Sequence, residues 1–124
     1  MTLSQEITES EFPIMKILWE NDELSIREVH DRLSKQKEWA YSTTKTTMDR
    51  MVKKGLLKRE SKHHVFLYSA IISKAQGMLK WVHFIADGFF ASSPQDVVAM
   101  FTDSGALSAQ EADELRALID EDLR

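Results

Sequence analysis

Hydroxyl and cationic side chains gather in one stretch of the sequence, Tyr41–Gly55. If this stretch is helical, with successive residues 100° apart, one side of it carries Ser42, Thr46, Asp49, Arg50 and Lys53, flanked by Thr43 and Lys45. The hydroxyls lie near its N-terminal end and the long cations further along. A helix in the major groove of DNA needs this order, because its N-terminal side chains meet base edges while those around them contact phosphates. A plain solvated helix is the alternative, which periodicity alone would favour.

The residues around this stretch favour the DNA interpretation. Ser42 is a suitable N-cap, and Gly55 is a suitable stop at the C-terminal end. Two β-prone runs follow, Leu56–Glu60 and Val65–Ser69, and four polar residues separate them. This pattern predicts a β-hairpin, and because no Asn-Gly or Asp-Gly marks its turn we expect a four-residue loop rather than a tight turn. Helix, glycine and basic hairpin follow one another in a winged helix-turn-helix.

The formal net charge of −4 conceals an uneven distribution. Residues 41–64 carry seven cations and two acids, a net charge of +5, which leaves −9 for the rest of the chain. DNA affinity depends on how many phosphates one surface neutralises and not on the total charge of the protein. The sequence therefore predicts a concentrated basic surface on an acidic chain.

Two helices are expected before this stretch, the first of them over residues 8–20. Both begin with the spacing of a capping box, Thr8 with Glu11 and Ser25 with Glu28. Together with the later helix and the hairpin, they predict a mainly α winged helix-turn-helix domain over residues 6–71, made of three helices and a small β-hairpin wing.

Residues 72–124 are expected to form a helical region rich in apolar side chains. A long helix ending near Phe90 is apolar on more than one face, and about 50 residues are too few to bury such side chains alone. They either fold back on the winged helix or pair with the same segment of a second chain. We favour the second arrangement, a homodimer. The side chains expected at its interface are Met78, Val82, Ile85, Phe89, Val97, Phe101, Leu115 and Ile119.

Composition and motifs argue against several classes of site. The chain has no cysteine, so disulfides and thiolate metal sites are excluded. No phosphate-binding loop, nucleophile motif or zinc-protease motif is present, and we expect neither an enzyme nor a cofactor. The adjacent His63 and His64 would point to opposite faces of a strand, so a wing tip that touches DNA, or a plain solvated turn, is expected rather than a metal site.

The sequence also bears on where the protein works. No apolar run approaches the ~20 residues of a membrane span, and the N-terminus lacks the cationic and apolar regions of a signal peptide. We therefore expect a cytoplasmic protein that does not insert into a membrane.

Four segments together resemble the penicillinase-repressor (BlaI/MecI/CopY) family. They are Thr8–Trp19, Ser25–Val29, Tyr41–Gly55 and the following Leu56–Arg59. The resemblance implies a homodimeric winged-helix repressor that binds dyad operators through its N-terminal domain and silences resistance genes. It also implies a sensor metalloprotease as a further partner. In the β-lactam branch this system leads to cleavage between an asparagine and a phenylalanine, and the matching bond here is Met100–Phe101. The copper branch uses a Cys-x-Cys pair, which this chain lacks.

Carried over residue by residue, the resemblance also implies the residues that contact DNA. The base readers would be Ser42, Thr43, Thr46 and Arg50. Apart from the resemblance, we expect contacts to the DNA backbone from the nearby cations, the first residue of the helix and the tip of the wing, which are Tyr41, Lys45, Lys53, Lys54, Arg59, Lys62, His63 and His64. Asp49 would either read a base itself or orient Arg50, since both face outward.

The sequence thus predicts a cytoplasmic, homodimeric, winged-helix transcriptional repressor that silences resistance or stress genes. The rival hypothesis is a winged helix used as a protein-interaction module, with no operator. The outer face of the 41–55 helix separates the two, because only a repressor requires it to discriminate between DNA sequences.

Overall fold

A computed structural model describes residues 7–35, 37–90 and 93–122, without the side chains of Phe89, Phe90 and Asp122. Contacts divide the chain into two units, Met1–Ser73 and Lys74–Arg124. The predicted fold class is confirmed: three helices and a two-stranded hairpin form a winged helix-turn-helix, and further helices follow it.

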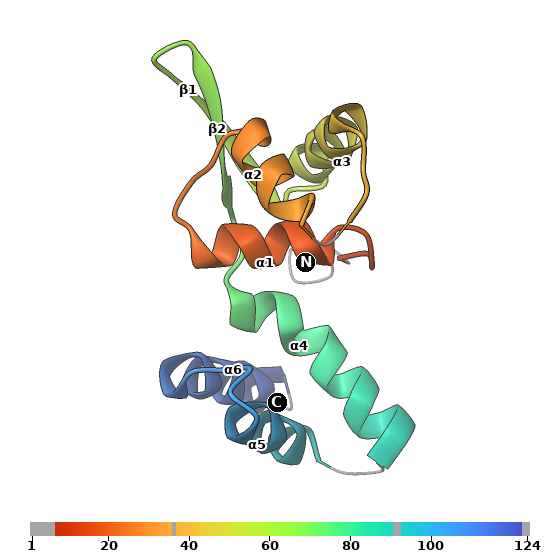
Figure 1. Cartoon of the computed structure of the whole chain (residues 1–124). Helices are drawn as coiled ribbons and strands as arrows, with labels where there is room; N and C mark the ends of the chain where they lie inside the picture. The colour runs from red at the N-terminus through yellow and green to blue at the C-terminus, as the bar shows by residue number, and fades with distance from the viewer. Residues whose placement is uncertain (1–6, 36, 91–92, 123–124) are drawn as a thin grey trace. The chain divides into compact units, whose positions relative to one another are not determined.

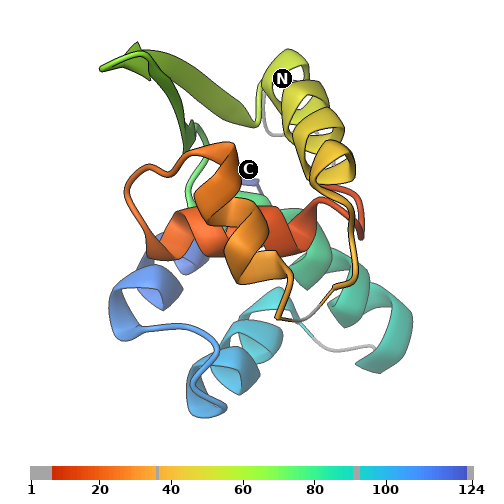
Figure 2. The same cartoon turned by 45° about the horizontal axis from the view of Figure 1, so that its top comes forward.

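The N-terminal unit follows the order expected of a winged helix (Figure 1). Its elements are α1 (Phe12–Glu20), α2 (Ile26–Leu33), α3 (Tyr41–Lys53), β1 (Leu57–Lys62) and β2 (Val65–Ala70). In Figures 1 and 2 the hairpin extends away from α1, and both α2 and α3 contact its strands. The strands pair antiparallel, and Leu24 adds an isolated bridge to Tyr68 with two backbone hydrogen bonds of 3.0 and 2.8 Å.

One apolar core holds these elements together. Its buried side chains come from all three helices and both strands, and they are Ile7, Ile14, Met15, Leu18, Leu24, Ile26, Val29, Leu33, Met48, Met51, Leu56, Leu57 and Tyr68. Met48 and Met51 lie one helical turn apart, so together they turn one side of α3 toward the core. The opposite side of α3 is consequently directed outward.

Two predicted helix starts differ from the structure. The first helix begins at Phe12, because residues 9–11 form a turn in which the Glu11 carboxylate accepts a 2.9 Å hydrogen bond from the Thr8 backbone N–H. The cap of α3 is the extended Ala40 and not Ser42, and it offers no side-chain cap. Contacts from α2 to Tyr41 hold this start instead, and local sequence signals do not encode them.

The turn of the hairpin is tighter than predicted. Lys62 pairs with Val65, which leaves His63 and His64 as a two-residue turn. Both histidines have positive φ angles, 52° and 67°. This is the geometry of a type I′ turn, whose twist matches the twist of the flanking strands even where no glycine is present. The expected four-residue loop is therefore wrong.

The C-terminal unit is a small group of helices. It contains α4 (Lys74–Ile85), a π-helical turn η2 (Ala86–Phe90), α5 (Pro94–Asp103) and α6 (Ala109–Asp122). The three α-helices pack on one another (Figure 1). Ser93 caps α5 through a 3.2 Å hydrogen bond from the Asp96 backbone N–H. Within the described residues, no helix is both long and apolar enough to cross a bilayer.

The side chains predicted at a dimer interface fall into three groups. Those buried without any second chain are Met78, Val82, Val97, Leu115 and Ile119. Ile85 and Phe101 are half-buried, and the side chain of Phe89 lies outside the described part. The argument that the segment cannot bury such side chains alone is therefore wrong for the first group, since three amphipathic helices cover one another. Whether any of the eight contacts a second chain stays a prediction.

Candidate nucleic-acid interface

The exposed side of α3 carries the four predicted base readers. Ser42, Thr43, Thr46 and Arg50 are all exposed, whereas Thr44 and Thr47 are buried with the two core methionines. Short hydroxyls occupy the first two turns of α3 and the guanidinium lies one turn further along. The helical geometry assumed from the sequence therefore holds, while the role of each side chain toward DNA stays a prediction.

Arg50 has a protein partner that sequence reasoning missed. Its Nε lies 3.4 Å from Glu11 Oε2, and Lys54 Nζ lies 2.7 Å from Glu11 Oε1. Glu11 is fully buried at the start of α1, so one carboxylate joins that end of α1 to the last turns of α3. The capping-box spacing with Thr8 predicts only a local hydrogen bond for Glu11. It does not indicate the ion pairs with Arg50 and Lys54, which lie about 40 positions further along the chain.

The charge state of Glu11 follows from these contacts. Burial raises its pKa, but hydrogen bonds from Lys54 and from the Thr8 backbone, together with the Lys54 charge, outweigh burial and leave the pKa below its ordinary value of 4.5. The carboxylate is consequently ionised at neutral pH and holds both cations.

Asp49 does not have the partner suggested by the sequence. Its Oδ2 accepts a 2.9 Å hydrogen bond from Lys45 Nζ, and its Oδ1 lies 3.9 Å from Arg59 Nη1. The hydrogen bond and the charge of Asp49 raise the pKa of Lys45. Asp49 thus links α3 to the wing, while Arg50 turns toward α1.

The wing is tied to the helical body by a second ion pair. Lys62 Nζ lies 2.9 and 3.2 Å from the two carboxylate oxygens of Glu23, which precedes the bridging Leu24. On the same strand, the Arg59 guanidinium lies 4.6 Å from the centre of the Phe66 ring. Like Lys45 and Lys54, the predicted phosphate contacts Arg59 and Lys62 are therefore already engaged within the protein.

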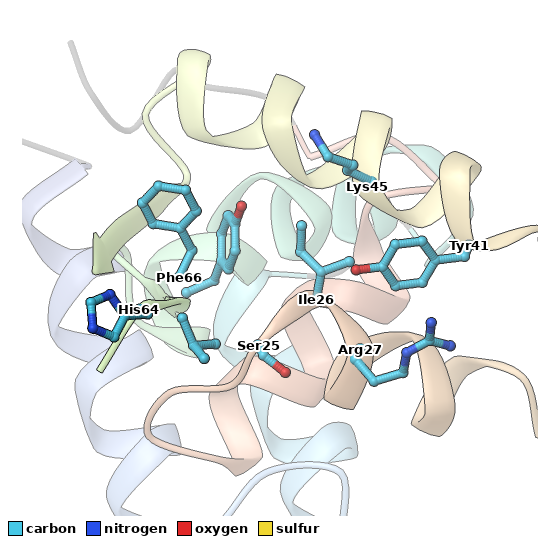
Figure 3. A pocket seen from close by; sticks show the side chains of 9 residues that line it. Ser25, Ile26, Arg27, Tyr41, Lys45, His64 and Phe66 are labelled. Atoms are coloured by element: carbon cyan, nitrogen blue, oxygen red, sulfur yellow. The ribbon is translucent and has the colours of Figure 1, made fainter. Parts of the chain in front are cut away.

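A pocket of about 350 Å³ lies between the starts of α2 and α3 and the second strand of the wing (Figure 3). Figure 3 shows Tyr41 and Arg27 on one side of it and Phe66 and His64 on the other. The side chains that line it are Ser25, Ile26, Arg27, Tyr41, Lys45, His64, Val65, Phe66 and Tyr68. It combines cations with aromatic walls on the outer surface of the winged helix.

Arg27 is a further residue that sequence reasoning did not single out. Its guanidinium carbon lies 4.3 Å from the centre of the Tyr41 ring, the range of a cation–π contact. The His30 ring meets the same tyrosine edge-on, and His30 Nδ1 lies 2.8 Å from the hydroxyl of the buried Thr44. These contacts fix the start of α3 against α2. Nothing in the local sequence around Arg27 or Tyr41 indicates that the two side chains are in contact.

The bond that matches the cleavage site of the resembled family lies within a helix. Met100 and Phe101 are in the second half of α5, with Met100 half-exposed and Phe101 partly buried. Proteases act most readily on exposed, irregular segments, so this bond is protected while α5 remains folded.

Comparisons with known proteins agree over nearly the whole chain. The model of the penicillinase repressor family matches residues 7–121. A penicillinase repressor of Bacillus licheniformis is 28% identical over 116 residues, which cover 94% of this chain and 91% of that protein. The methicillin resistance regulatory protein MecI of Staphylococcus aureus strain N315 is 25% identical over 114 residues, 92% of this chain and 93% of that protein.

Solved structures are similar as well. The DNA-binding domain of the repressor BlaI superposes with a TM-score of 0.53 at 30% identity, covering 58% of this chain and 88% of that one. Monomeric BlaI of Bacillus licheniformis in complex with the blaP half-operator gives a TM-score of 0.52 at 31% identity, covering 57% of this chain and 87% of that one.

Proposed function

Because the chain belongs to the penicillinase repressor family, we propose that it is a homodimeric transcriptional repressor that binds a dyad operator in double-stranded DNA. The family consists of DNA-binding repressors and not of enzymes. By this proposal the chain silences resistance or stress genes, and the names of its relatives, a penicillinase repressor and a methicillin resistance regulator, support resistance genes.

The exposed side of α3 is the observation that carries this proposal. It places Ser42, Thr46 and Arg50 on successive turns of an outward face, with the core methionines behind it. In the proposed complex this face enters the major groove, and the hydroxyls near the N-terminus meet base edges. The related BlaI, solved with a half-operator, supports a DNA partner for this fold.

The pocket between α3 and the wing would receive the sugar–phosphate backbone of one strand. If α3 enters the major groove and the wing lies over the minor groove, the DNA strand between the two grooves would cross this place. Arg27 and Lys45 supply positive charge there, and the rings of Tyr41 and Phe66 offer apolar walls to a deoxyribose. Further phosphate contacts in the proposal are Lys53, Lys54, Arg59, Lys62, His63 and His64.

Dimerisation would use the exposed apolar surface of the C-terminal unit. Phe84 is 58% exposed, Met100 50% and Trp81 38%. Contiguous exposed apolar patches mark association surfaces, and the rings of Trp81 and Phe84 are neighbours, with their centres 6.4 Å apart. Two copies of α3 about one DNA turn apart would then read the two halves of a dyad.

Relief of repression by proteolysis at Met100–Phe101 completes the proposal. The bond is helical, so cleavage would require α5 to unwind first, and a sensor metalloprotease would act on that opened form. Replacing Ala99 with proline breaks the helix interior and leaves the Met100–Phe101 bond itself unchanged, so the purified protein should become more sensitive to limited proteolysis at this bond.

Footprinting on the promoter region of its own gene, at a low and a high salt concentration, tests the DNA-binding part. We expect a protected dyad that weakens with salt, since each phosphate contact steepens the salt dependence by ~0.9. An absence of protection at low salt would instead favour a winged helix that binds a protein partner.

Two matched variants then separate sequence reading from backbone contact. Arg50→Ala and Lys54→Met each remove one partner of Glu11, but only Arg50 is proposed to read a base. Arg50→Ala should lose roughly 1–3 kcal/mol of discrimination at one base pair, the usual value of a bidentate base contact. Lys54→Met should weaken binding to all sequences alike. Equal operator preference in both variants would remove Arg50 from the base-reading set.

A further inference from the structure

Asp49 is the only acidic residue of α3, and it lies among the cations that the proposed function assigns to DNA. It accepts a 2.9 Å hydrogen bond from Lys45, one turn earlier on the helix. It also lies 3.9 Å from Arg59, whose guanidinium is 4.6 Å from the Phe66 ring. A continuous set of contacts thus runs from α3 through β1 to β2.

The geometry argues against direct base reading by Asp49. Its Oδ1 is buried and has no hydrogen-bond partner, and its Oδ2 is occupied by Lys45. An oxygen without accessible surface cannot meet the edge of a base while the wing stays in place. The role of orienting Arg50 is also unsupported, because Arg50 contacts Glu11 instead.

We propose that Asp49 is a specificity-determining residue that holds Lys45 and Arg59 in one position and so limits binding to DNA of other sequences. This inference rests on the proposed repressor function. Two long cations that are free to move can follow phosphates in many poses and on any sequence. When Asp49 holds both cations, they can contact only a DNA backbone that lies where the base contacts of α3 place it. Specificity often depends on such a feature that disfavours the wrong partner, in addition to contacts with the right one.

The test compares Asp49→Asn with Glu60→Gln in the full-length protein. The two variants remove the same charge, one from α3 and the other from the strand β1 that contacts it. Glu60 pairs with Lys58 at 3.6 Å on β1, a contact that involves neither Lys45 nor Arg59. Binding is measured to the footprinted operator and to a shuffled duplex of equal length and composition, each over a series of salt concentrations. Circular dichroism and urea unfolding establish that both variants remain folded.

Asp49→Asn should raise affinity for the shuffled duplex roughly three- to tenfold, the range for releasing two exposed ion pairs. Its salt dependence on that duplex should steepen by up to ~1.8, two phosphate contacts at ~0.9 each. Affinity for the operator should rise less, so that the ratio between the two duplexes falls. Glu60→Gln should raise both affinities equally and leave the ratio unchanged.

A cycle of variants ties the effect to the two cations. In a Lys45→Met, Arg59→Met background, Asp49→Asn should no longer change the affinity for the shuffled duplex or its salt dependence. An effect of the same size in that background would overturn the inference, because the cause would then be charge repulsion alone.

Three other results would also overturn it. One is an identical response of Asp49→Asn and Glu60→Gln. Another is a loss of operator affinity in Asp49→Asn that is confined to one base pair, with the shuffled duplex unaffected, since that would make Asp49 a base reader. The third is a wild-type protein without operator preference, which would overturn the proposed function as well, whereas the first two leave that function intact.

Discussion

Glu11 is a single buried carboxylate that sets the relation between the first and third helices of the winged helix. It accepts from the Thr8 backbone at 2.9 Å and from Lys54 at 2.7 Å, and it lies 3.4 Å from Arg50. Because a buried charge is stable only when it is paired and hydrogen-bonded, α1 and α3 have to stay in register for Glu11 to remain ionised. The direction of the outer face of α3 therefore depends on the residue that immediately precedes α1.

Replacing Glu11 with glutamine should destabilise the protein by about 2 kcal/mol, the usual loss for hydrogen bonds to a charged group. Urea unfolding at neutral pH measures the effect. The control is Glu9→Gln, since Glu9 is exposed in the adjoining turn and should change the unfolding free energy by less than about 0.5 kcal/mol. Equal effects at the two positions would contradict a structural role for the buried carboxylate.

The same residue predicts a pH dependence of stability. The folded-state pKa of Glu11 lies below 4.5, so its ionised form stabilises the fold above about pH 4.5. This contribution is lost as the pH falls through the lower folded-state pKa. The difference in unfolding free energy between wild type and Glu11→Gln should therefore shrink as the pH is lowered from about 6 to about 3. A difference that stays constant over this range would mean that the glutamate acts through shape alone.

At the scale of elements, the wing combines a strained turn with two anchors. His63 and His64 hold positive φ angles without being glycine, which is unfavourable for L-residues because Cβ approaches the neighbouring carbonyl. The bridge from Leu24 to Tyr68 and the Lys62–Glu23 ion pair fix the hairpin from its sides. Pairing along the strands, together with these anchors, thus imposes a turn conformation that two histidines do not favour by themselves.

Replacing His63 with asparagine and His64 with glycine should stabilise the protein by about 1–2 kcal/mol, because Asn-Gly is the preferred type I′ turn. Thermal or urea unfolding measures the gain. Alanine at both positions keeps Cβ at each site and should give no such gain. If the histidines also contact the DNA backbone, both double variants should lose DNA affinity to a similar extent, which tests that assignment separately from the strain.

At the scale of the whole molecule, the C-terminal helices combine an interior with an exposed apolar surface. Ile119 is fully buried within one chain, whereas Phe84 is more than half exposed. A charge at each position should consequently act in a different way, because only the first has to be placed in an apolar interior.

Ile119→Glu should unfold the C-terminal unit and lower the helical circular dichroism signal. Phe84→Glu should keep the helical content but shift the sedimentation equilibrium from dimer to monomer and weaken operator binding. Leu118→Glu, at a half-buried position next to Ile119, should fall between the two in its loss of helicity. A folded Phe84→Glu variant that stays dimeric would place the interface elsewhere on the unit.

Local sequence patterns determined much of the fold. The capping box of α2 appears where the spacing predicted it, at Ser25 with Glu28. Gly55 ends the third helix with a φ of 83°, the conformation that glycine adopts most readily. The exposed side of α3 also follows from its periodicity. All these signals act between residues a few positions apart, which is why sequence alone reveals them.

Tertiary structure decided which charges meet and which apolar side chains are interior. Glu11 with Lys54, Asp49 with Arg59, and Arg27 with Tyr41 are pairs from different elements. The tight turn of the wing and the burial of Ile119 likewise depend on partners far along the chain. Contacts of this kind form only when helices and strands pack together, because the energy of a charge or an apolar group depends on its surroundings in space and not on its neighbours in sequence.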